Sequence, residues 1–374
     1  MKIIVGGGIS GLWLAAELKA RHIPFVLLER GKLGAGQTLA SQGMIHGGTK
    51  YALDGLLTPA AAAIGQMPTR WREALAGRGS VNLSQVETER DDQLLWSVDS
   101  VATRLVGFFA SKAMRSRMQR IEPRDEVAFA EGFSGHLYRL SEPVLKLDTL
   151  VPAFIEQLDG HLVHAHVHRL LRNSQGKVRG VETDQGSIQG EVIVCAGEGT
   201  EALLNASDLS EPAMQRRPLA MSVVRLANPI PEVFGHQLGV GNKPKLTVST
   251  HQVGDVQSLY LGGQLAEDGV HRSDDEHIEA TRAALREGLG WLSPEPTRID
   301  VFRINRAEPA TGQGSRPDHA FVTRLEGAWV AWPTKLALAP ALADEIVPHL
   351  SDDSNATHLA WPKAQAGGYP WALA

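Results

Sequence analysis

The first thirty residues constrain the fold more than any other part of this chain. An apolar run at residues 2–5 leads directly into the glycine-rich residues 6–11, which are followed by a run of helix-forming residues. A second apolar run ends on Glu29, where a carboxylate can accept hydrogen bonds from a ribose diol. This order predicts strand, glycine turn, helix, strand and acid, which is the βαβ unit that binds dinucleotides.

The glycines of this unit have distinct predicted roles. Gly6 allows the tight turn, Gly8 lets the backbone approach a pyrophosphate, and Gly11 lets the helix pack close to the strand. Ile9 and Ser10 lie between these glycines and belong to the same predicted cofactor site. The pyrophosphate would then sit at the positive end of the helix.

Length and composition limit the other possibilities. A chain of 374 residues is too long for one compact core, so we expect two domains. The net charge of −5 argues against nucleic acid as a partner. The single cysteine, Cys195, forms no internal disulfide, and we therefore expect a reducing, cytoplasmic location. We find no stretch long and apolar enough to span a membrane, and Glu17 and Lys19 distinguish the N-terminus from a signal peptide.

A second glycine-rich segment, residues 31–48, follows Glu29. It is small and polar, and we expect a loop that opens a helix around Thr38. Backbone N–H groups and hydroxyls of such a loop can bind phosphate oxygens, and its glycines favour close approach to a ligand. The alternative is a solvated loop.

Residues 101–120 are expected to form one helix with a basic face. The segment carries five basic residues, no acid and several large apolar residues. Such a helix can rest on an anionic membrane surface. Alternatively, its basic face is solvated or lies opposite an anionic substrate.

The middle of the chain predicts further strands of a parallel sheet and a β-meander. After a helix at residues 59–76, residues 162–168 alternate strictly between apolar and polar, which predicts one strand. Its three histidines share a face, but no acid or cysteine completes a metal site, and we expect no metal. The apolar strand at residues 191–197 ends on Ala196 and Gly197, which suits a parallel sheet whose carboxyl edge touches the cofactor.

The remaining residues differ in kind. Residues 218–270 alternate between apolar and polar and contain many turn signals, which predicts an antiparallel sheet. A helix is predicted after it, at residues 274–292. Residues 298–306 predict a strand that carries arginines, and residues 328–332 and 338–347 predict a last strand and helix. The C-terminal tail is expected to lie on the surface, without assigned chemistry.

The order of these parts resembles the flavoprotein superfamily of D-amino-acid oxidase, glycine oxidase and sarcosine oxidase. The sharpest match is residues 41–51, Ser-Gln-Gly-Met-Ile-His-Gly-Gly-Thr-Lys-Tyr. It is similar to a segment of FAD-dependent glycerol-3-phosphate dehydrogenases, which have arginine in place of Lys50, and of L-2-hydroxyglutarate dehydrogenases or oxidases. Residues 304–308 resemble the segment whose arginine holds the substrate's acid group, although Asn305 stands where glycine is usual. Residues 334–336 are similar to a Lys-Leu turn of the glycerol phosphate enzymes, but the turn lacks the superfamily's glycines.

The resemblance implies FAD as cofactor and an α/β fold. A Rossmann-like FAD-binding domain, with a parallel sheet and a β-meander, would comprise residues 1–76, 145–212 and 301–350. A second α+β substrate domain, built on an antiparallel sheet, would comprise residues 77–144 and 213–300, leaving residues 351–374 as the tail. The presence of one dinucleotide fingerprint and no second one also favours FAD over NAD.

The resemblance further implies a path for FAD. The adenosine would lie near Glu29 and Arg30 with the backbone of Val167 against the adenine, and the isoalloxazine would lie between residues 43–48 and residues 334–336. The predicted cofactor-binding residues are Gly6, Gly8, Ile9, Ser10, Gly11, Glu29, Arg30, Thr38, Ser41, Gln42, Gly43, Ile45, Val167, Ala196, Gly197, Thr334, Lys335 and Leu336.

The implied reaction is hydride transfer from a substrate C–H bond to flavin N5. The implied substrate is a small anionic 2-hydroxy acid or polyol phosphate. Arg306 is the predicted anion anchor, since guanidinium pairs bidentately with carboxylate or phosphate, although a plain ion pair is the alternative. Lys50 and Tyr51 are secondary anchors, and Lys335 would stabilise negative charge on reduced flavin.

An alcohol substrate also needs a base for its hydroxyl proton, and His46 and His251 are the candidates. A neutral amine needs no such base, so an FAD-dependent amino-acid or amine oxidase or dehydrogenase is the alternative. The electron acceptor would be O2, a quinone or another carrier. Less favoured are an NAD(P)H-dependent hydroxylase, whose late Gly-Asp motif we do not find, and a surface-binding protein that keeps FAD for structure. The acidic balance disfavours a tRNA-modifying role.

Overall fold

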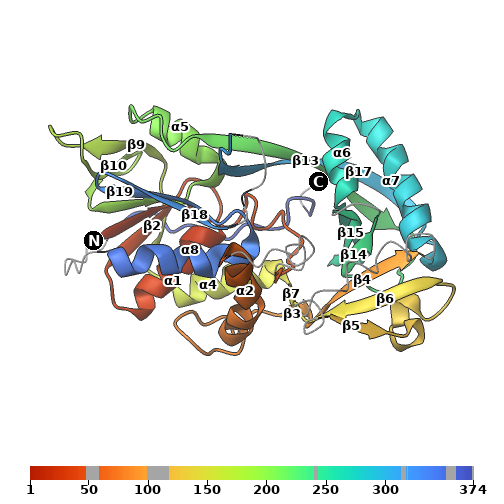
Figure 1. Ribbon diagram of the computed structural model, residues 1–374. Coiled ribbons are helices and arrows are strands. Elements are labelled where there is room, and N and C mark those ends of the chain that lie inside the picture. The colour runs from red at the N-terminus through yellow and green to blue at the C-terminus, as the bar shows by residue number, and fades with distance from the viewer. Residues whose placement is uncertain are drawn as a thin grey trace.

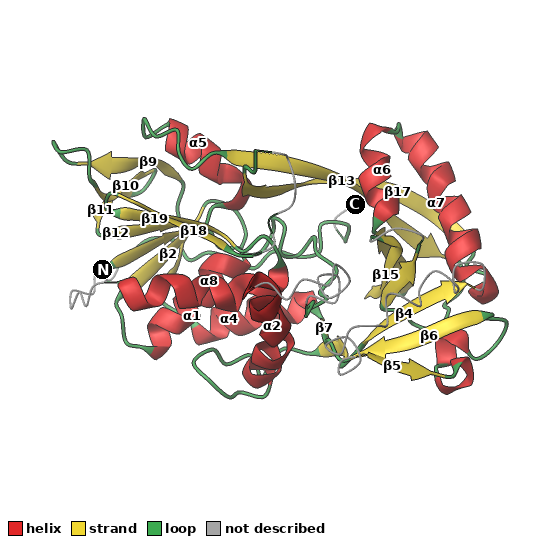
Figure 2. Ribbon diagram, in the orientation of Figure 1, coloured by secondary structure: helices red, strands yellow, loops and turns green. Residues whose placement is uncertain are grey.

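The computed structural model of the protein describes residues 1–47, 59–98, 118–239, 243–312, 317, 319–350 and 359–372. Two halves, each organised around its own sheet, lie side by side, and two long strands run between them (Figure 1). The fold is the mixed α/β arrangement that the sequence predicts (Figure 2).

A six-stranded sheet organises the first half. Its order is β18-β19-β12-β1-β2-β8, and all neighbouring pairs are parallel except β18–β19. Ile4 and Leu27 pack on the helices of one face, and Ile3 and Val26 pack toward the meander on the other. Because both faces are covered, the strands are mostly apolar, and their polar residues lie mainly at strand ends and in the edge strand β18. The strands are β1 (Lys2–Val5), β2 (Phe25–Glu29), β8 (Leu162–His164), β12 (Glu191–Val194), β18 (Phe321–Leu325) and β19 (Ala328–Trp332).

Helices cover one face of this sheet. The helix α1 lies beside α4 and α8, with α2 at its outer side (Figure 1). Trp13 of α1 packs on Trp71 of α2, with ring centroids 4.7 Å apart, so that α1 is buried almost all round. The helices are α1 (Ile9–Ala20), α2 (Pro59–Leu75), α4 (Leu147–Gln157) and α8 (Ala339–Ile346), and those at residues 59–76 and 338–347 were predicted.

A three-stranded antiparallel meander and the short helix α5 cover the other face. The meander comprises β9 (Val167–Arg172), β10 (Val178–Thr183) and β11 (Gly186–Gln189), and α5 is Thr200–Asn205. The predicted single strand at residues 162–168 is wrong, because it is divided between β8 and β9. The Ala165 N–H still donates to the Glu29 carbonyl of the parallel sheet, whereas Val167 already pairs with Thr183 of the meander. One alternating segment therefore serves two sheets.

An eight-stranded sheet organises the second half, in the order β17-β13-β16-β15-β14-β4-β6-β5. The helices α6 (Gln264–Asp268) and α7 (Asp274–Leu289) lie beside it (Figure 1), and Ser273 and Glu276 form a capping box at the start of α7. The strands are β4 (Gln93–Val98), β5 (Met118–Ile121), β6 (Gly135–Leu140), β13 (Met214–Leu226), β14 (Gly235–Leu238), β15 (Pro244–Val253), β16 (Val256–Gly262) and β17 (Pro296–Pro309).

The predicted basic helix at residues 101–120 is corrected where the structure describes it. Met118–Ile121 is the edge strand β5, which pairs with β6. Tertiary pairing thus overrides the helical pattern at this end, and the rest of the predicted helix lies outside the described residues. The helix predicted at residues 274–292 ends earlier, at Leu289, and continues as a short 3-10 turn.

The strands β13 and β17 form a long antiparallel ribbon between the halves (Figure 2). The ribbon pairs Met214 with Pro309 at one end and Leu226 with Pro296 at the other. A two-stranded sheet of β3 (Thr88–Arg90) and β7 (Val144–Leu145) forms a second connection. The domain boundaries given above remain a proposal.

The described part of the C-terminal tail lies on the surface only in part, and that expectation is wrong for its aromatic end. Tyr369 and Trp371 are 8% and 4% exposed, and the Trp371 ring lies 4.0 Å from that of Tyr260 in β16. Upstream, the tail bridges to Leu33 and Val163 of the first half. Its aromatic side chains bury enough apolar area to draw the tail between the two halves.

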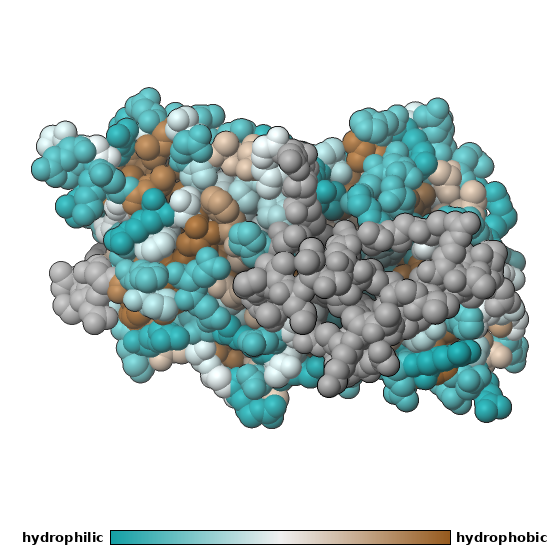
Figure 3. Space-filling view, in the orientation of Figure 1, coloured by the Kyte–Doolittle hydropathy of each residue, from teal (hydrophilic) through white to brown (hydrophobic). Residues whose placement is uncertain are grey.

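Hydrophilic side chains cover most of the described surface in the view of Figure 3. Among the described residues, Val127 and Val256 are the exposed large apolar side chains. No helix in the described ranges is both long enough and apolar enough to cross a membrane.

Candidate active site

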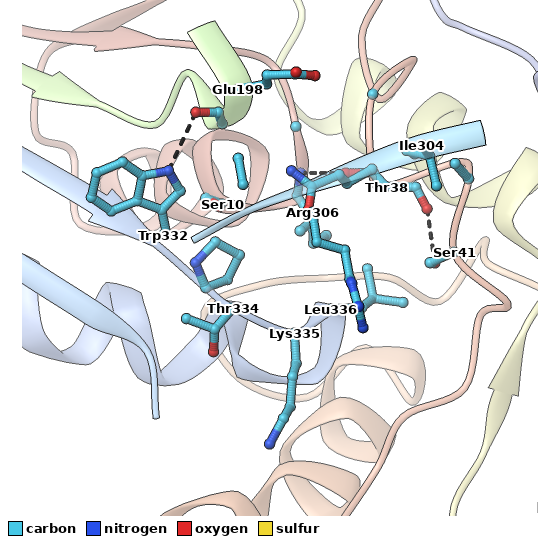
Figure 4. Close-up of a pocket in the computed structure, with 18 of the residues that line it drawn as sticks. Ser10, Thr38, Ser41, Glu198, Ile304, Arg306, Trp332, Thr334, Lys335 and Leu336 are labelled. Carbon is cyan, nitrogen blue, oxygen red and sulfur yellow. Dashed lines mark hydrogen bonds between the residues drawn. The ribbon is translucent and has the colours of Figure 1, made fainter. Parts of the chain in front are cut away.

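A cavity of about 1260 Å³ follows the carboxyl edge of the six-stranded sheet and reaches the eight-stranded sheet. It exceeds the roughly 300–1000 Å³ of most small-molecule sites, so it has room for a dinucleotide and a substrate together. Part of its wall is drawn in Figure 4. The predicted residues that line it are Gly6, Gly8, Ile9, Ser10, Glu29, Arg30, Thr38, Ser41, Gln42, His46, Val167, Ala196, Gly197, Arg306, Thr334, Lys335 and Leu336.

Close packing leaves no room for side chains at two glycines of the first turn. Gly6 has a φ of +110°, and a Cβ there would lie 2.5 Å from the Cys195 carbonyl oxygen. A Cβ at Gly11 would lie 2.0 Å from the Gly6 carbonyl oxygen. At Gly8 the nearest atom, Thr38 Oγ1, would be 3.5 Å away, and Gly8 faces the cavity. The first turn of α1 carries no acid, its N-cap residue is a glycine, and Thr38 accepts only the Ile9 N–H, so the other N–H groups of the turn can bind an anion.

The carboxylate of Glu29 is held by two backbone groups. Oε2 accepts the Gly7 N–H and Oε1 accepts the Gly31 N–H, each at 2.7 Å. The remaining lone pairs of the carboxylate can accept hydroxyl groups of a ribose. Arg30 and Val167 line the cavity beside it.

Side chains of the second glycine-rich segment fix its path along the cavity. Thr38 Oγ1 accepts the Ile9 N–H at 2.9 Å, and Ser41 Oγ donates to the Thr38 carbonyl at 2.8 Å (Figure 4). Gln42 Nε2 donates to the Tyr260 carbonyl of β16 at 2.9 Å. The segment thereby joins the start of α1 to the eight-stranded sheet.

Three residues predicted to bind the cofactor lie behind the cavity wall. Gly43 has a φ of +70°, and a Cβ there would lie 2.3 Å from the Leu145 carbonyl oxygen. Ile45 is fully buried in the core, and Gly11 packs on Gly6. Their positions give them a packing role, because the wall itself is made by their neighbours.

His46 lines the cavity between a carboxylate and a second histidine. Its Nδ1 lies 3.8 Å from Glu142 Oε2, and its ring centroid lies 5.3 Å from that of His236. Glu142 is 1% exposed, and its Oε1 accepts the Gly47 N–H at 2.8 Å. Burial and the neighbouring His46 lower the pKa of His236 to about 3, so His236 is neutral.

Arg306 lies on β17 directly opposite Arg217 on β13. Both line the cavity, and carboxylates offset their like charges. Arg217 Nε donates to Glu308 at 2.7 Å, whereas Arg306 NH1 lies 3.6 Å from Glu267, which also binds Lys243. Burial opposes ionisation of Glu267, but Lys243, Arg306 and Arg217 lower its pKa overall. Arg306 therefore has the looser described carboxylate contact of the two arginines.

The final turn brings Lys335 to the same cavity (Figure 4). Trp332 Nε1 donates to the Gly197 carbonyl at 3.3 Å, which ties the turn to the end of β12. Thr334 takes a φ of +59°, a conformation that is unusual for a β-branched residue and costs on the order of 1–3 kcal/mol. Thr334 thus adopts a backbone conformation that glycine adopts freely.

The structure separates His251 from the other candidates. His251 lies under the tail, 5.5 Å from the Trp371 ring and 6.4 Å from the Tyr260 ring, and is outside the cavity lining. It is therefore excluded as a base in this arrangement. Lys50 and Tyr51 lie outside the described residues.

The sequence analysis missed Glu142, His236 and Glu267. None of them belongs to a local motif. Glu142 follows β6, His236 lies in β14 and Glu267 lies in α6, and these elements meet at the cavity only in the folded protein. The only local signal was that His236 and Glu142 adjoin short apolar runs, as inward-facing residues do.

The wall fits FAD. The open face of Gly8, the start of α1 without an acidic residue and the oriented Glu29 carboxylate match a pyrophosphate and a ribose. Thr38, Ser41 and Lys335 continue this set toward the eight-stranded sheet.

Comparisons with known proteins also indicate FAD as the cofactor. The family model described as DAO, FAD dependent oxidoreductase, matches residues 2–347. The chain is 42% identical to "Probable FAD-dependent oxidoreductase PA4991" of Pseudomonas aeruginosa over 368 residues, 96% of this chain and 94% of that protein. The crystal structure of PA4991 superposes with a TM-score of 0.86 at 35% identity, covering 100% of this chain and 97% of that one.

More distant similarities are of two kinds. A 52-residue match at 38% identity, 14% of this chain and 9% of its relative, is to an anaerobic glycerol-3-phosphate dehydrogenase of Haemophilus influenzae. Glycine oxidase of Geobacillus kaustophilus shares the fold, with a TM-score of 0.65 at 15% identity over 98% of this chain and 99% of that one.

Proposed function

The chain belongs to the DAO family of FAD-dependent oxidoreductases, and we propose that it oxidises a small anionic 2-hydroxy acid or polyol phosphate. The observation that carries this proposal is the pairing of a cationic wall around Arg306 with a histidine–carboxylate pair, His46 and Glu142, in one cavity. Bound FAD supplies the acceptor for the hydride of the substrate C–H bond.

Arg306 supplies recognition of the anion. Its guanidinium projects into the cavity beside Leu336 (Figure 4), and its described carboxylate contact, with Glu267, is 3.6 Å long. A substrate carboxylate or phosphate gains shorter, charge-assisted hydrogen bonds there. The neighbouring Arg217 is already bound to Glu308, so it adds positive potential to the wall.

His46 supplies the base that an alcohol requires. A hydroxyl proton must leave as the C–H bond breaks, and a neutral imidazole within reach can accept it. Leu95, Leu140 and Leu238 line the same cavity and make part of its wall apolar. The match to the anaerobic glycerol-3-phosphate dehydrogenase makes polyol phosphates a class to test beside hydroxy acids.

The test is an anaerobic stopped-flow experiment that follows flavin absorbance with 2-hydroxy acids, polyol phosphates and amino acids. We expect one of the first two classes to bleach the flavin. Bleaching by amino acids alone would refute the proposal in favour of the CH–NH alternative.

Arg306→Met should lower the bleaching rate at subsaturating substrate by about 10²-fold, since a pair of charged hydrogen bonds is lost. The matched control is Arg303→Met on the same strand, whose side chain is 44% exposed and binds Asp274 outside the cavity. Equal losses in the two variants would refute the role of Arg306.

A further inference from the structure

We propose that Glu142 is a positioning residue that holds His46 in the tautomer with hydrogen on Nδ1. The other ring nitrogen, Nε2, then presents a lone pair to the substrate. This inference rests on the proposed function for its consequence, but its central claim concerns two residues of the chain and can be measured without a substrate.

Glu142 is a buried carboxylate that forms part of the cavity wall. It follows β6, is 1% exposed and lines the cavity. Its Oε1 accepts the N–H of Gly47, the residue after His46, at 2.8 Å. This bond ties the carboxylate to the peptide group that follows the histidine it faces.

The second carboxylate oxygen faces the imidazole. Glu142 Oε2 lies 3.8 Å from His46 Nδ1, which is longer than a hydrogen bond but within reach of a small ring rotation. Such contacts in active sites commonly tighten when substrate binds. A carboxylate accepts but cannot donate, so the Nδ1–H tautomer is the one that it favours.

His236 lies beside His46 but cannot take its place as the base. Its Nδ1 lies 2.9 Å from Thr247 Oγ1 and its Nε2 lies 3.3 Å from Gln93 Oε1, so both ring nitrogens have partners within β15 and β4. Desolvation keeps His236 neutral, and it cannot exchange roles with the exposed ring of His46. Among the described residues, Glu142 and His236 are the titratable groups that lie next to the His46 ring.

The proton and electrons then have defined destinations. The carbinol carbon is oxidised to a carbonyl, and its C–H electron pair leaves with the hydride for the FAD. The hydroxyl proton passes to His46 Nε2, and Glu142 offsets the positive charge that the imidazole gains.

The direct test is nitrogen NMR of the FAD-loaded protein labelled with 15N in the histidine rings, with His46 assigned by its loss in His46→Gln. We expect the Nδ1–H tautomer in the wild type, and the Nε2–H tautomer or a mixture in Glu142→Gln. The wild type alone decides the central claim, because an Nε2–H tautomer there overturns it even if the variant does not fold.

The kinetic test uses the substrate class that bleaches the flavin fastest. Glu142→Gln should lower the limiting bleaching rate about 10²-fold and leave the half-saturating concentration within about twofold. The control is Glu87→Gln, a 63% exposed glutamate paired with Lys146 away from the cavity. An unchanged limiting rate would overturn the positioning role.

The two tests separate the two hypotheses. If hydroxy acids and polyol phosphates fail to bleach the flavin but His46 is the Nδ1–H tautomer, the proposed function is wrong and the positioning of His46 stands. If they bleach it and His46 is the Nε2–H tautomer, the reverse holds.

Discussion

Replacement of His251 should remove a defined part of the acid sensitivity of this protein. His251 is 6% exposed beneath the aromatic tail, and its Nε2 lies 2.9 Å from Ser249 Oγ. Burial lowers its pKa from 6.5 to about 4, so the folded protein holds the imidazole in its neutral form. The unfolded chain, by contrast, protonates this side chain near its ordinary pKa.

The sign of the effect follows from proton counts. Between pH 6.5 and pH 4 the unfolded state binds more protons than the folded state, so stability falls as the pH falls through this window. The full difference corresponds to about 3.4 kcal/mol, and about 2 kcal/mol of it is lost between pH 7.5 and pH 5. His236, whose pKa is lowered to about 3, contributes in the same direction and is unchanged by a substitution at His251.

The assay is urea unfolding of the wild type and His251→Gln at pH 7.5 and pH 5, with FAD saturating throughout. The quantity compared is the difference in unfolding free energy between the two pH values. We expect this difference to be about 2 kcal/mol smaller in the variant, with similar m-values. The control, His271→Gln, alters an exposed histidine and should retain the wild-type difference. A variant that loses as much stability on acidification as the wild type would refute the reasoning.

Three further predictions concern packing and backbone geometry. Trp371→Ala should destabilise the protein by about 3–5 kcal/mol in urea unfolding, whereas Trp361→Ala, at a half-buried position, should cost clearly less; equal costs would contradict the buried tail. Thr334→Gly should be more stable than Thr334→Ala by about 1 kcal/mol, because only glycine adopts the positive φ freely; the opposite order in thermal unfolding would argue against the strained turn. Gly11→Ala should purify with little flavin, as absorbance at 450 nm would show, since its Cβ would lie 2.0 Å from the Gly6 carbonyl; full flavin content would contradict this packing.

The parts of the fold that the sequence predicts well are those in which neighbouring residues interact. The unit β1-α1-β2 was predicted because its glycine spacing has one common structural use. The strand β19 was also predicted, since a short apolar run between turn signals leaves little choice.

Long-range contacts explain what sequence reasoning did not predict. The tail carries no motif that shows where it packs, yet its aromatic residues lie on Tyr260 and His251, more than a hundred residues earlier in the chain. His251 was a candidate base because it lies in the antiparallel sheet that was expected to cover the site, and its burial under Trp371 depends on that packing. Glu142 and His46 come together only when the end of β6 packs beside the second glycine-rich segment. The residues around each of them in the sequence therefore do not predict the pair.

The strand order of the six-stranded sheet has a consequence for synthesis on the ribosome. The strands β1 and β2 emerge well before β12, but the other edge of β1 pairs with β12, about 190 residues later. At the usual 5–20 residues per second, that edge waits about 10–40 s for its partner. All eight strands of the other sheet end by Pro309, before β18 begins at Phe321. The half that contains β1 is therefore completed after the other half, and a nascent chain gains its whole FAD cradle only once the turn at residues 333–336 has emerged.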